Sequence, residues 1–263
     1  MLENECLPAE DADLEIGTPI LYLSRKVMWA RCPSIRAIRV KLADLSRYAE
    51  AAGLSVRGAF HPRPEDGVPS RDTEPVGTLV LLGWAGGRHW PSFAASPEAV
   101  DGALHPLDRW SERVIGAMAK EFGAAALYPF GGPSYWPFQR WAQRGDNVFA
   151  SPLGMYVHPV HGLWHSYRGA LCFRQRLDLP PKEIQAHPCE SCAAKPCLDT
   201  CPVGAFTTAG YDVERCAAHV RSAEGAACRQ GGCLARRACP VAPGQAYGAE
   251  EAGFYMKAFL AAH

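Results

Sequence analysis

Eleven cysteines stand in the sequence, and eight of them fall between positions 189 and 239. They form two groups of four, and each group ends in a Cys-Pro pair. The first group is Cys189, Cys192, Cys197 and Cys201, and the second is Cys216, Cys228, Cys233 and Cys239. A cubane iron–sulfur cluster is held by four thiolates. The sequence therefore predicts two 4Fe-4S clusters, which would transfer single electrons.

Zinc is the competing metal, because its structural sites also take four cysteines. Zinc ribbons usually present two CxxC pairs per ion. In this region that spacing occurs at Cys189 and Cys192 alone, so we favour iron–sulfur clusters and keep zinc as the alternative. Cys6, Cys32 and Cys172 lie outside the two groups, and we expect them to be buried or incidental thiols.

The first group resembles the ligand run of bacterial two-cluster ferredoxins, with two extra residues in its middle gap. In those ferredoxins the cysteine before proline binds the other cluster. The resemblance therefore implies ligand sets that cross between the groups. One cluster would take Cys189, Cys192, Cys197 and Cys239, and the other would take Cys201, Cys216, Cys228 and Cys233. Each half of the segment would then depend on the other for folding.

Hydrophobic periodicity predicts the elements that must position these cysteines. Apolar residues three or four apart predict helices at 42–52, 106–123 and 138–144 and within 249–263. Alternating or continuous apolar runs predict strands at 55–60, 77–84 and 124–130. Residues 61–77 are expected to form a long surface loop. Residues 151–173 are expected to form two strands of a hairpin, joined at about Pro159 to Gly162.

After Pro181 the composition changes to cysteine, alanine, glycine and short polar links, which predicts a domain boundary. We expect an irregular N-terminal segment (1–35), a body (36–182), a ferredoxin-like segment (183–245) and a C-terminal helix (246–263). The helix is expected to dock on the body through the apolar residues Phe254, Met256, Phe259 and Leu260.

The charge pattern predicts a protein without membrane or nucleic-acid partners. Lys+Arg and Asp+Glu both number 27, so the formal net charge is zero and gives no global attraction for polyanions. No apolar run is long enough to span a bilayer, and the acidic N-terminus lacks the basic region of a secretory signal. We therefore expect a cytoplasmic location, where clustered cysteines bind metal rather than form disulfides.

The turn GGPSYWP, residues 131–137, allows the backbone to approach a bulky planar ligand. The aromatic residues around it could line such a pocket or simply form a packed core; they are Tyr128, Phe130, Tyr135, Trp136 and Phe138. Three histidines, His158, His161 and His165, could bind a metal. We favour a structural role for them, because no carboxylate or cysteine stands at ligand spacing.

The stretch VHPVHGLWHSYRGALCFRQRLDLPP, together with HPLDRWSERVIGAMAKEFGAAALYPF, resembles the cobalamin-processing proteins of the CblC type. That resemblance implies an α+β fold with a nitroreductase-like body that binds cobalamin (vitamin B12). Gly131, Gly132, Pro133 and Tyr135 would form the turn facing the corrin ring. His158, Trp164 and Arg168 would form the hairpin wall of the pocket.

The layout of a body followed by a two-cluster ferredoxin resembles epoxyqueuosine reductase and the reductive dehalogenases. The first family carries an aspartate proton donor where this chain has Ser134, and continues into helical repeats that bind tRNA. Epoxide reduction on tRNA is therefore not our leading expectation. Tyr135 is the candidate proton donor by its likeness to the tyrosine of the dehalogenases.

Three functional hypotheses follow from these resemblances. The leading one is an oxidoreductase whose clusters reduce the cobalt of a bound corrinoid and remove or exchange its upper ligand. The second is a cobalamin-dependent reductase of an organic substrate, and the third is a non-catalytic electron-transfer ferredoxin with an inactive body. A ferredoxin or flavodoxin is the expected electron donor.

Overall fold

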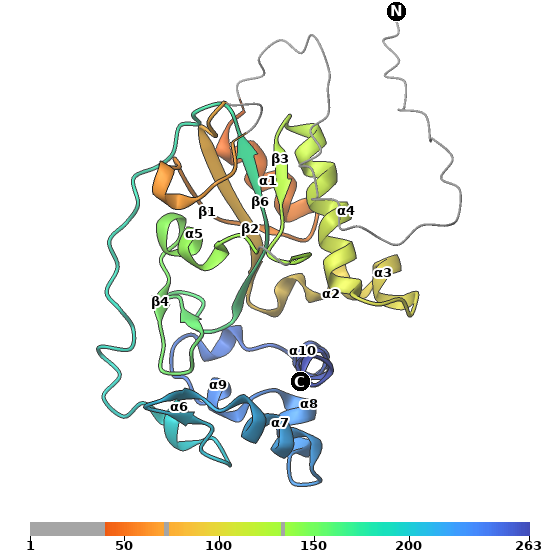
Figure 1. Ribbon diagram of the computed structural model, residues 1–263, viewed down its shortest axis with the longest axis vertical. Coiled ribbons are helices and arrows are strands. Elements are labelled where there is room, and N and C mark those ends of the chain that lie inside the picture. The colour runs from red at the N-terminus through yellow and green to blue at the C-terminus, as the bar shows by residue number, and fades with distance from the viewer. Residues whose placement is uncertain (1–39, 71–73, 133–134) are drawn as a thin grey trace, which may run out of the picture.

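The computed structural model of the protein describes residues 40–70, 74–132 and 135–263. Figure 1 shows the sheet and most of the larger helices at one end and the short helices of the cysteine-rich part at the other. We call residues 40–182 the body and residues 183–245 the cysteine segment. The predictions for residues 1–35, Cys6, Cys32, Pro133 and Ser134 lie outside the described residues.

The body is a mixed arrangement of helices and strands. Its elements in chain order are α1 (Leu42–Ala51), β1 (Ser55–Phe60), η1 (Pro64–Asp66), β2 (Thr78–Ala85), η2 (Gly87–His89), α2 (Trp90–Ala94), α3 (Pro97–Val100), α4 (Pro106–Glu121), β3 (Ala125–Leu127), α5 (Phe138–Gly145), β4 (Phe149–Ala150), β5 (Tyr156–Val157) and β6 (His165–Phe173). The main sheet has four strands in the order β1-β2-β6-β3, and every neighbouring pair is antiparallel.

Strand β2 is buried along its whole length, which explains its continuous apolar sequence. Val80, Leu82 and Trp84 pack with α1, α2 and α4 on one face of the sheet. Leu79 and Leu81 pack with α5 on the other face. Helices therefore cover both faces of an antiparallel sheet, and the core lies in two layers. Each fully buried side chain of this size contributes about 1.5–3 kcal/mol.

The structure confirms most of the elements predicted for the body. The predicted helices are α1, α4 and α5, and the first two predicted strands are β1 and β2. Strand β3 ends at Leu127, earlier than predicted. The reason is that Tyr128 and Phe130 leave the sheet and stack on each other, with ring centroids 5.3 Å apart.

The predicted hairpin in residues 151–173 is wrong. Strand β5 pairs with β4, whereas β6 pairs with β2 and β3. Between β5 and β6 the chain makes a tight loop, closed by the two backbone hydrogen bonds between His158 and Gly162. Strand β6 is recruited to the centre of the main sheet, because its residues from Gly169 to Phe173 are apolar and become buried between the two helical layers.

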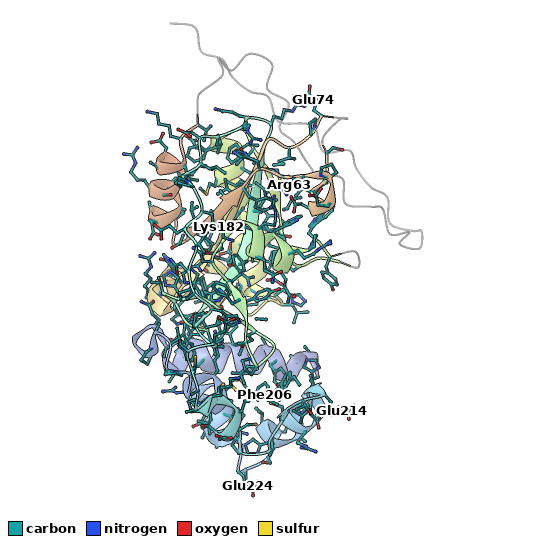
Figure 2. All side chains as sticks on the ribbon, turned by 90° about the vertical axis from the view of Figure 1, so that its left-hand side faces the viewer. Arg63, Glu74, Lys182, Phe206, Glu214 and Glu224 are labelled. Carbon is teal, nitrogen blue, oxygen red and sulfur yellow. The ribbon has the colours of Figure 1, made fainter. Side chains whose placement is uncertain are left out.

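The cysteine segment contains only short elements, joined by turns. They are α6 (Pro196–Asp199), β7 (Phe206–Thr207), β8 (Gly210–Tyr211), α7 (Val213–Arg221), α8 (Ala226–Gly231), α9 (Leu234–Arg237) and η3 (Pro243–Gln245). In Figure 2, Phe206 and Glu214 lie in this part, and Glu224 lies at the end of the molecule opposite to Glu74. A segment built from so few long elements depends on additional cross-links, such as metal ligation, for its stability.

The last helix, α10 (Ala249–Ala262), lies between the body and the cysteine segment. Phe254 packs on Trp90 and Phe93 of the body, with ring centroids 5.3 and 5.4 Å apart. Met256 instead lines a cavity of the cysteine segment. Of the four apolar residues named from sequence, Phe254 thus contacts the body and Met256 contacts the cysteine segment. In the part of the chain that the structure describes, no helix combines the length and apolar character needed to cross a bilayer.

Candidate functional site

The eight clustered cysteines lie on the short elements of the cysteine segment and on the turns between them. Cys189 and Cys192 precede α6, Cys197 lies in it and Cys201 follows it. Helix α6 begins at Pro196, directly after Lys195, whose φ of 40° turns the chain sharply. Cys216 lies in α7, Cys228 in α8, Cys233 at the N-cap of α9, and Cys239 just beyond α9.

Four of these thiols form one spatial group, which we call the body-facing cysteines: Cys189, Cys192, Cys197 and Cys239. Burial raises the pKa of the Cys189 thiol, and nearby Cys239, Cys197 and Cys192 raise it further. Burial also raises the pKa of Cys197, followed by the charges of Cys239 and Cys192. Cys239 thus lies with the three cysteines that precede it by more than forty residues.

The other four, Cys201, Cys216, Cys228 and Cys233, line one cavity together with apolar residues such as Val220 and Met256. We call them the outer cysteines. Burial raises the pKa of Cys233, and the charges of Cys216 and Cys228 raise it further. The Cys201 sulfur accepts a hydrogen bond from the Ala205 amide at 3.3 Å. Amide–sulfur hydrogen bonds of this kind tune the potential of a cluster.

These two spatial groups contain the same residues as the two ligand sets implied by the ferredoxin resemblance. Among the described residues, no three His, Cys, Asp or Glu side chains are arranged to hold a single metal ion. In a cubane, by contrast, each thiolate binds a different iron at a corner of the cluster. Two separate groups of four thiols suit that form of ligation.

The body-facing cysteines contact the body directly. Cys197 and Cys239 form one apolar cluster with the buried body residues Leu153, Val157 and Leu163. The outer cysteines are covered by Met256 of α10 instead. A cluster held by the body-facing cysteines would therefore be the one adjacent to the body.

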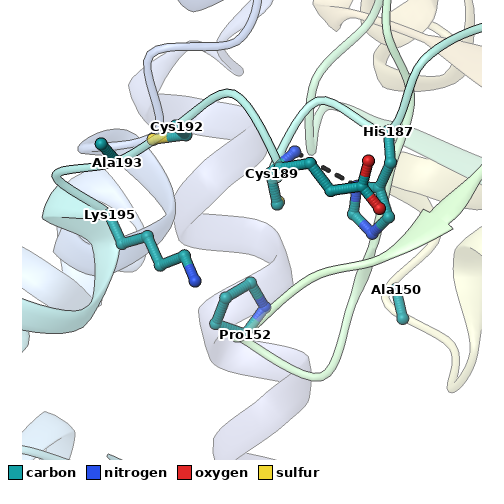
Figure 3. A pocket seen from close by; sticks show the side chains of 8 residues that line it. Ala150, Pro152, His187, Cys189, Cys192, Ala193 and Lys195 are labelled. Atoms are coloured by element: carbon teal, nitrogen blue, oxygen red, sulfur yellow. Dashed lines mark hydrogen bonds between the residues drawn. The ribbon is translucent and has the colours of Figure 1, made fainter.

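An open pocket of about 400 Å³ adjoins the body-facing cysteines. Figure 3 shows Lys195 and Pro152 on one side and His187 on the other, with Cys189 between them. The Cys189 amide donates a hydrogen bond to His187 Nδ1 at 3.2 Å. This contact fixes the turn that carries the first cysteine.

Cys172 lies in the core of the body, apart from the two groups of clustered cysteines. It is buried in β6, where it packs in the core layer that contains Leu79, Leu81 and Trp141. Burial raises the pKa of its thiol to about 12, so the thiol stays protonated and unreactive. The expectation of a buried thiol is confirmed for this residue.

His158 is held by partners on both of its ring nitrogens. Its Nδ1 accepts hydrogen bonds from the amides of Val160 and His161, and its Nε2 lies 3.3 Å from Asp146 Oδ1. Asp146 also accepts hydrogen bonds from Arg57 at 3.0 Å and from the Tyr167 hydroxyl at 2.8 Å. These partners hold the His158 ring in place, and the network of Asp146 was not predicted from sequence.

His161 and His165 are neutral at physiological pH. The pKa of His161 is lowered to about 4 and that of His165 to about 3, mainly by burial and next by the positive charge of Arg57. His165 Nε2 pairs with the Tyr156 carbonyl oxygen at 3.0 Å. These two rings therefore add no positive charge to this part of the body.

The residues that the CblC resemblance assigns to a corrin pocket do not line either of the two pockets described above. Tyr135 is 69% exposed, and its ring lies against Gly132. Arg168 donates to Asp108 at 2.5 Å and to Ser111 at 3.1 Å.

Trp164 is covered by the chain itself. The Arg236 guanidinium lies 4.5 Å from the Trp164 ring centroid and 4.6 Å from that of Tyr247. Arg236 also donates to the Leu163 carbonyl at 2.5 Å. This stack joins α9 to the loop before β6, and it covers one face of the Trp164 ring. Sequence reasoning missed Arg236, although its position midway between Cys233 and Cys239 was a usable signal.

No family model matches the sequence, and no curated protein matches it. Three solved structures of epoxyqueuosine reductase are similar to the chain. One, with an epoxyqueuosine-modified tRNA-Tyr stem loop, shares 15% identity at a TM-score of 0.41 and aligns over 78% of this chain and 66% of its own.

The second, from Bacillus subtilis with its catalytic loop swung out of the active site, shares 16% identity at a TM-score of 0.40 over 78% of this chain and 66% of its own. The third, a selenomethionine-labelled structure, shares 15% identity at a TM-score of 0.38 over 80% of this chain and 68% of its own. The chain thus spans about two thirds of the length of these neighbours. The likeness is distant in both sequence and superposition, and it assigns no role to any residue of this chain.

Proposed function

We propose that the protein is a two-cluster iron–sulfur electron-transfer protein of the reductase kind. One 4Fe-4S cluster is held by the body-facing cysteines and the other by the outer cysteines. The main support for this proposal is that the last cysteine of each sequence group lies with the other group in space. Cys239 lies with Cys189, Cys192 and Cys197, while Cys201 lies with Cys216, Cys228 and Cys233. Interleaved sets of this kind are what two interlocked cubanes require.

The short helices hold the two sets close to each other. Cys197 and Cys201 flank the end of α6, and Cys233 and Cys239 flank α9. Helices α6 and α9 pack together, so each of them presents one ligand to each cluster. The outer cluster would receive electrons, and the body-facing cluster would pass them toward the body. A small electron-donor protein of the ferredoxin or flavodoxin class is the partner that this chemistry needs.

Bound clusters would supply one-electron transfer, and the chain supplies their environment. The Ala205 amide stabilises negative charge on the Cys201 sulfur. Val220 and Met256 keep water from the outer cavity. Leu153, Val157 and Leu163 cover the buried Cys197 and Cys239 on the side that faces the body. Exclusion of water and amide–sulfur hydrogen bonds are the means by which a protein sets cluster potentials.

A corrinoid is the electron acceptor that the CblC resemblance implies, and the residues as arranged do not fit one. Trp164 is stacked under Arg236, Arg168 is bonded to Asp108, and Tyr135 is exposed. We therefore derive no step through a corrin ring. This arrangement supports electron transfer to another acceptor over upper-ligand exchange and corrinoid-dependent reduction.

Anaerobic purification with metal analysis and electron paramagnetic resonance tests the proposal. We expect about eight irons per chain and the spectrum of two reduced cubanes. Zinc in place of iron, or a single cluster, would overturn it.

Addition of cobalamins to the same preparation tests the acceptor. An unchanged visible spectrum is expected for the electron-transfer function. A shifted cobalamin spectrum would show that the protein binds a corrinoid and would replace this proposal with corrinoid-dependent chemistry.

A further inference from the structure

Glu251 on α10 is a buried carboxylate without a hydrogen-bond partner. The residue is 1% exposed, and neither carboxylate oxygen has a partner. Among the described residues, no other carboxylate has two buried oxygens that both lack a hydrogen-bond partner. Burying an unpaired charge is costly, and a buried polar group without partners calls for a functional explanation.

The carboxylate lies where the body, α9 and α10 meet. A Cβ placed on Gly87, in the turn after β2, would stand 3.0 Å from Glu251 Oε2, so the acid lies against bare backbone. The positive charge that acts on it is Arg236. That guanidinium is held by Trp164 and Tyr247 and donates to a carbonyl, so it stabilises the carboxylate without bonding to it.

The other ionisable groups around this point are tyrosines or are bonded elsewhere. Tyr247 and Tyr255 lie within electrostatic range of Glu251, and burial raises the pKa of both. Arg88 and His89 of η2 form hydrogen bonds with the Ser55 hydroxyl, and Arg168 of β6 donates to Asp108. Arg221 of α7 donates to the Leu260 carbonyl. Arg229 of α8 donates to the carbonyls of Val220 and Ser222. His219 of α7 lines the outer cavity.

Glu251 is close in the fold to the residues that hold the outer cluster. Its neighbour Ala252 packs on Gly232, where an added Cβ would stand 3.0 Å from the Ala252 Cβ. Gly232 directly precedes Cys233. Met256, just over one helical turn beyond Glu251, lines the cavity of the outer cysteines. Packed contacts of α10 thus connect the position of Glu251 with the outer cysteines. Because Glu251 is buried, we expect its proton affinity to respond to a change of charge on the outer cluster.

We propose that Glu251 is a proton-binding site coupled to reduction of the outer cluster. This inference rests on the proposed two-cluster function. When an external one-electron donor reduces the outer cluster, the Glu251 carboxylate takes up one proton from solvent, and the net charge of the region stays constant. When the electron leaves for the body-facing cluster, the carboxyl group releases the proton.

The acid has the right proton affinity for this role. Burial raises the pKa of Glu251 to about 7, against the opposing effect of Arg236. A group with a pKa close to ambient pH changes its protonation in response to a small change in local charge.

The test is a redox titration of the full-length holoprotein, followed by electron paramagnetic resonance, from about pH 5 to about pH 9. In the wild type we expect the midpoint potential of the outer cluster to fall as pH rises through neutrality. In Glu251→Gln, which keeps the shape and removes the titration, we expect that fall to be lost. Glu250→Gln is the matched control, because Glu250 is exposed on the same helix, and it should behave as the wild type. A pH dependence equal in Glu251→Gln and wild type, or absent from both, would overturn the inference.

An infrared measurement on the wild type makes the test independent of any variant. The reduced-minus-oxidised difference spectrum should contain the C=O band of a carboxylic acid formed on reduction, and its absence would count against the inference. Iron content and cluster signals are measured first on the same sample. Missing clusters would defeat the proposed function, whereas intact clusters with pH-independent potentials would defeat only the role of Glu251.

Discussion

Gly162 of the body lies directly against the backbone of Val241, two residues beyond Cys239. A Cβ on Gly162 would overlap the Val241 carbonyl oxygen, and the φ of Gly162 is +57°. The loop between β5 and β6 can therefore approach the chain that carries a body-facing cysteine only because this position has no side chain. The contact joins the body to the segment proposed to deliver electrons.

Gly162→Ala should weaken the attachment of the cysteine segment. An alanine in the left-handed backbone region lowers the free energy of unfolding by about 1 kcal/mol, and displacing the Val241 backbone lowers it by about 1–3 kcal/mol more. Denaturant unfolding of the anaerobic protein measures the loss. Gly154→Ala is the control, because Gly154 has a φ of +72° and nothing within 4 Å of its added Cβ. Equal losses in the two variants would mean that the Val241 contact contributes nothing.

Arg236→Lys should loosen the same junction by a different route. Lysine keeps the charge, but it loses the planar stack between Trp164 and Tyr247 and the fit to the Leu163 carbonyl. We expect a loss of about 1–3 kcal/mol. The matched substitution Arg237→Lys changes a neighbour whose hydrogen bond stays within the cysteine segment, and it should cost less. Unfolding curves compare the two, and equal losses would show that the stack does not stabilise the junction.

Cys239→Ser tests the crossing of the ligand sets. Because Cys239 lies with Cys189, Cys192 and Cys197, its loss should remove the body-facing cluster and lower the iron content from about eight to about four or fewer per chain. Iron analysis and electron paramagnetic resonance identify which cluster is lost. Cys172→Ser, in the core of the body, should leave the iron content unchanged. Selective loss of the outer signal in Cys239→Ser would show that the assignment is inverted.

Asp146→Asn should destabilise the body at neutral pH and progressively less in acid. Burial alone raises the pKa of Asp146, but the His158 hydrogen bond, the charge of Arg57 and the Tyr167 hydroxyl outweigh it, so the pKa lies well below its usual range. The stabilisation is therefore complete above the unfolded pKa of about 4 and is lost as pH falls through the folded value. Removing one partner of such a buried pair costs about 3–5 kcal/mol.

The measurement is the difference in unfolding free energy between Asp146→Asn and wild type at several pH values. Asp178→Asn, at an exposed position, supplies the control and should show almost no difference. A difference that stays constant into acid would mean that the Asp146 charge does not stabilise the fold.

The positions of the body's main helices and first strands could be predicted from sequence, because local periodicity and end signals decide them. Leu107, Trp110, Val114 and Met118 stand on one face of a helix whatever surrounds it, and they are buried in α4. Pairing could not be predicted in the same way. Strand β5 consists of two residues, and its choice of β4 over β6 depends on how the sheet accommodates β6 between its neighbours.

The candidate site, too, could be predicted from sequence only in part. Cysteine number and spacing determined that the chain carries enough potential ligands for two sets of four, because both are properties of the chain itself. The fold brings Cys239 to the first group and Cys201 to the second. Tertiary structure alone decided that Arg236 is stacked on Trp164, that Asp146 holds His158, and that Glu251 is buried without a partner. These contacts join residues from different elements, and the free energy of a charge depends on its surroundings in space, which periodicity along the chain does not specify.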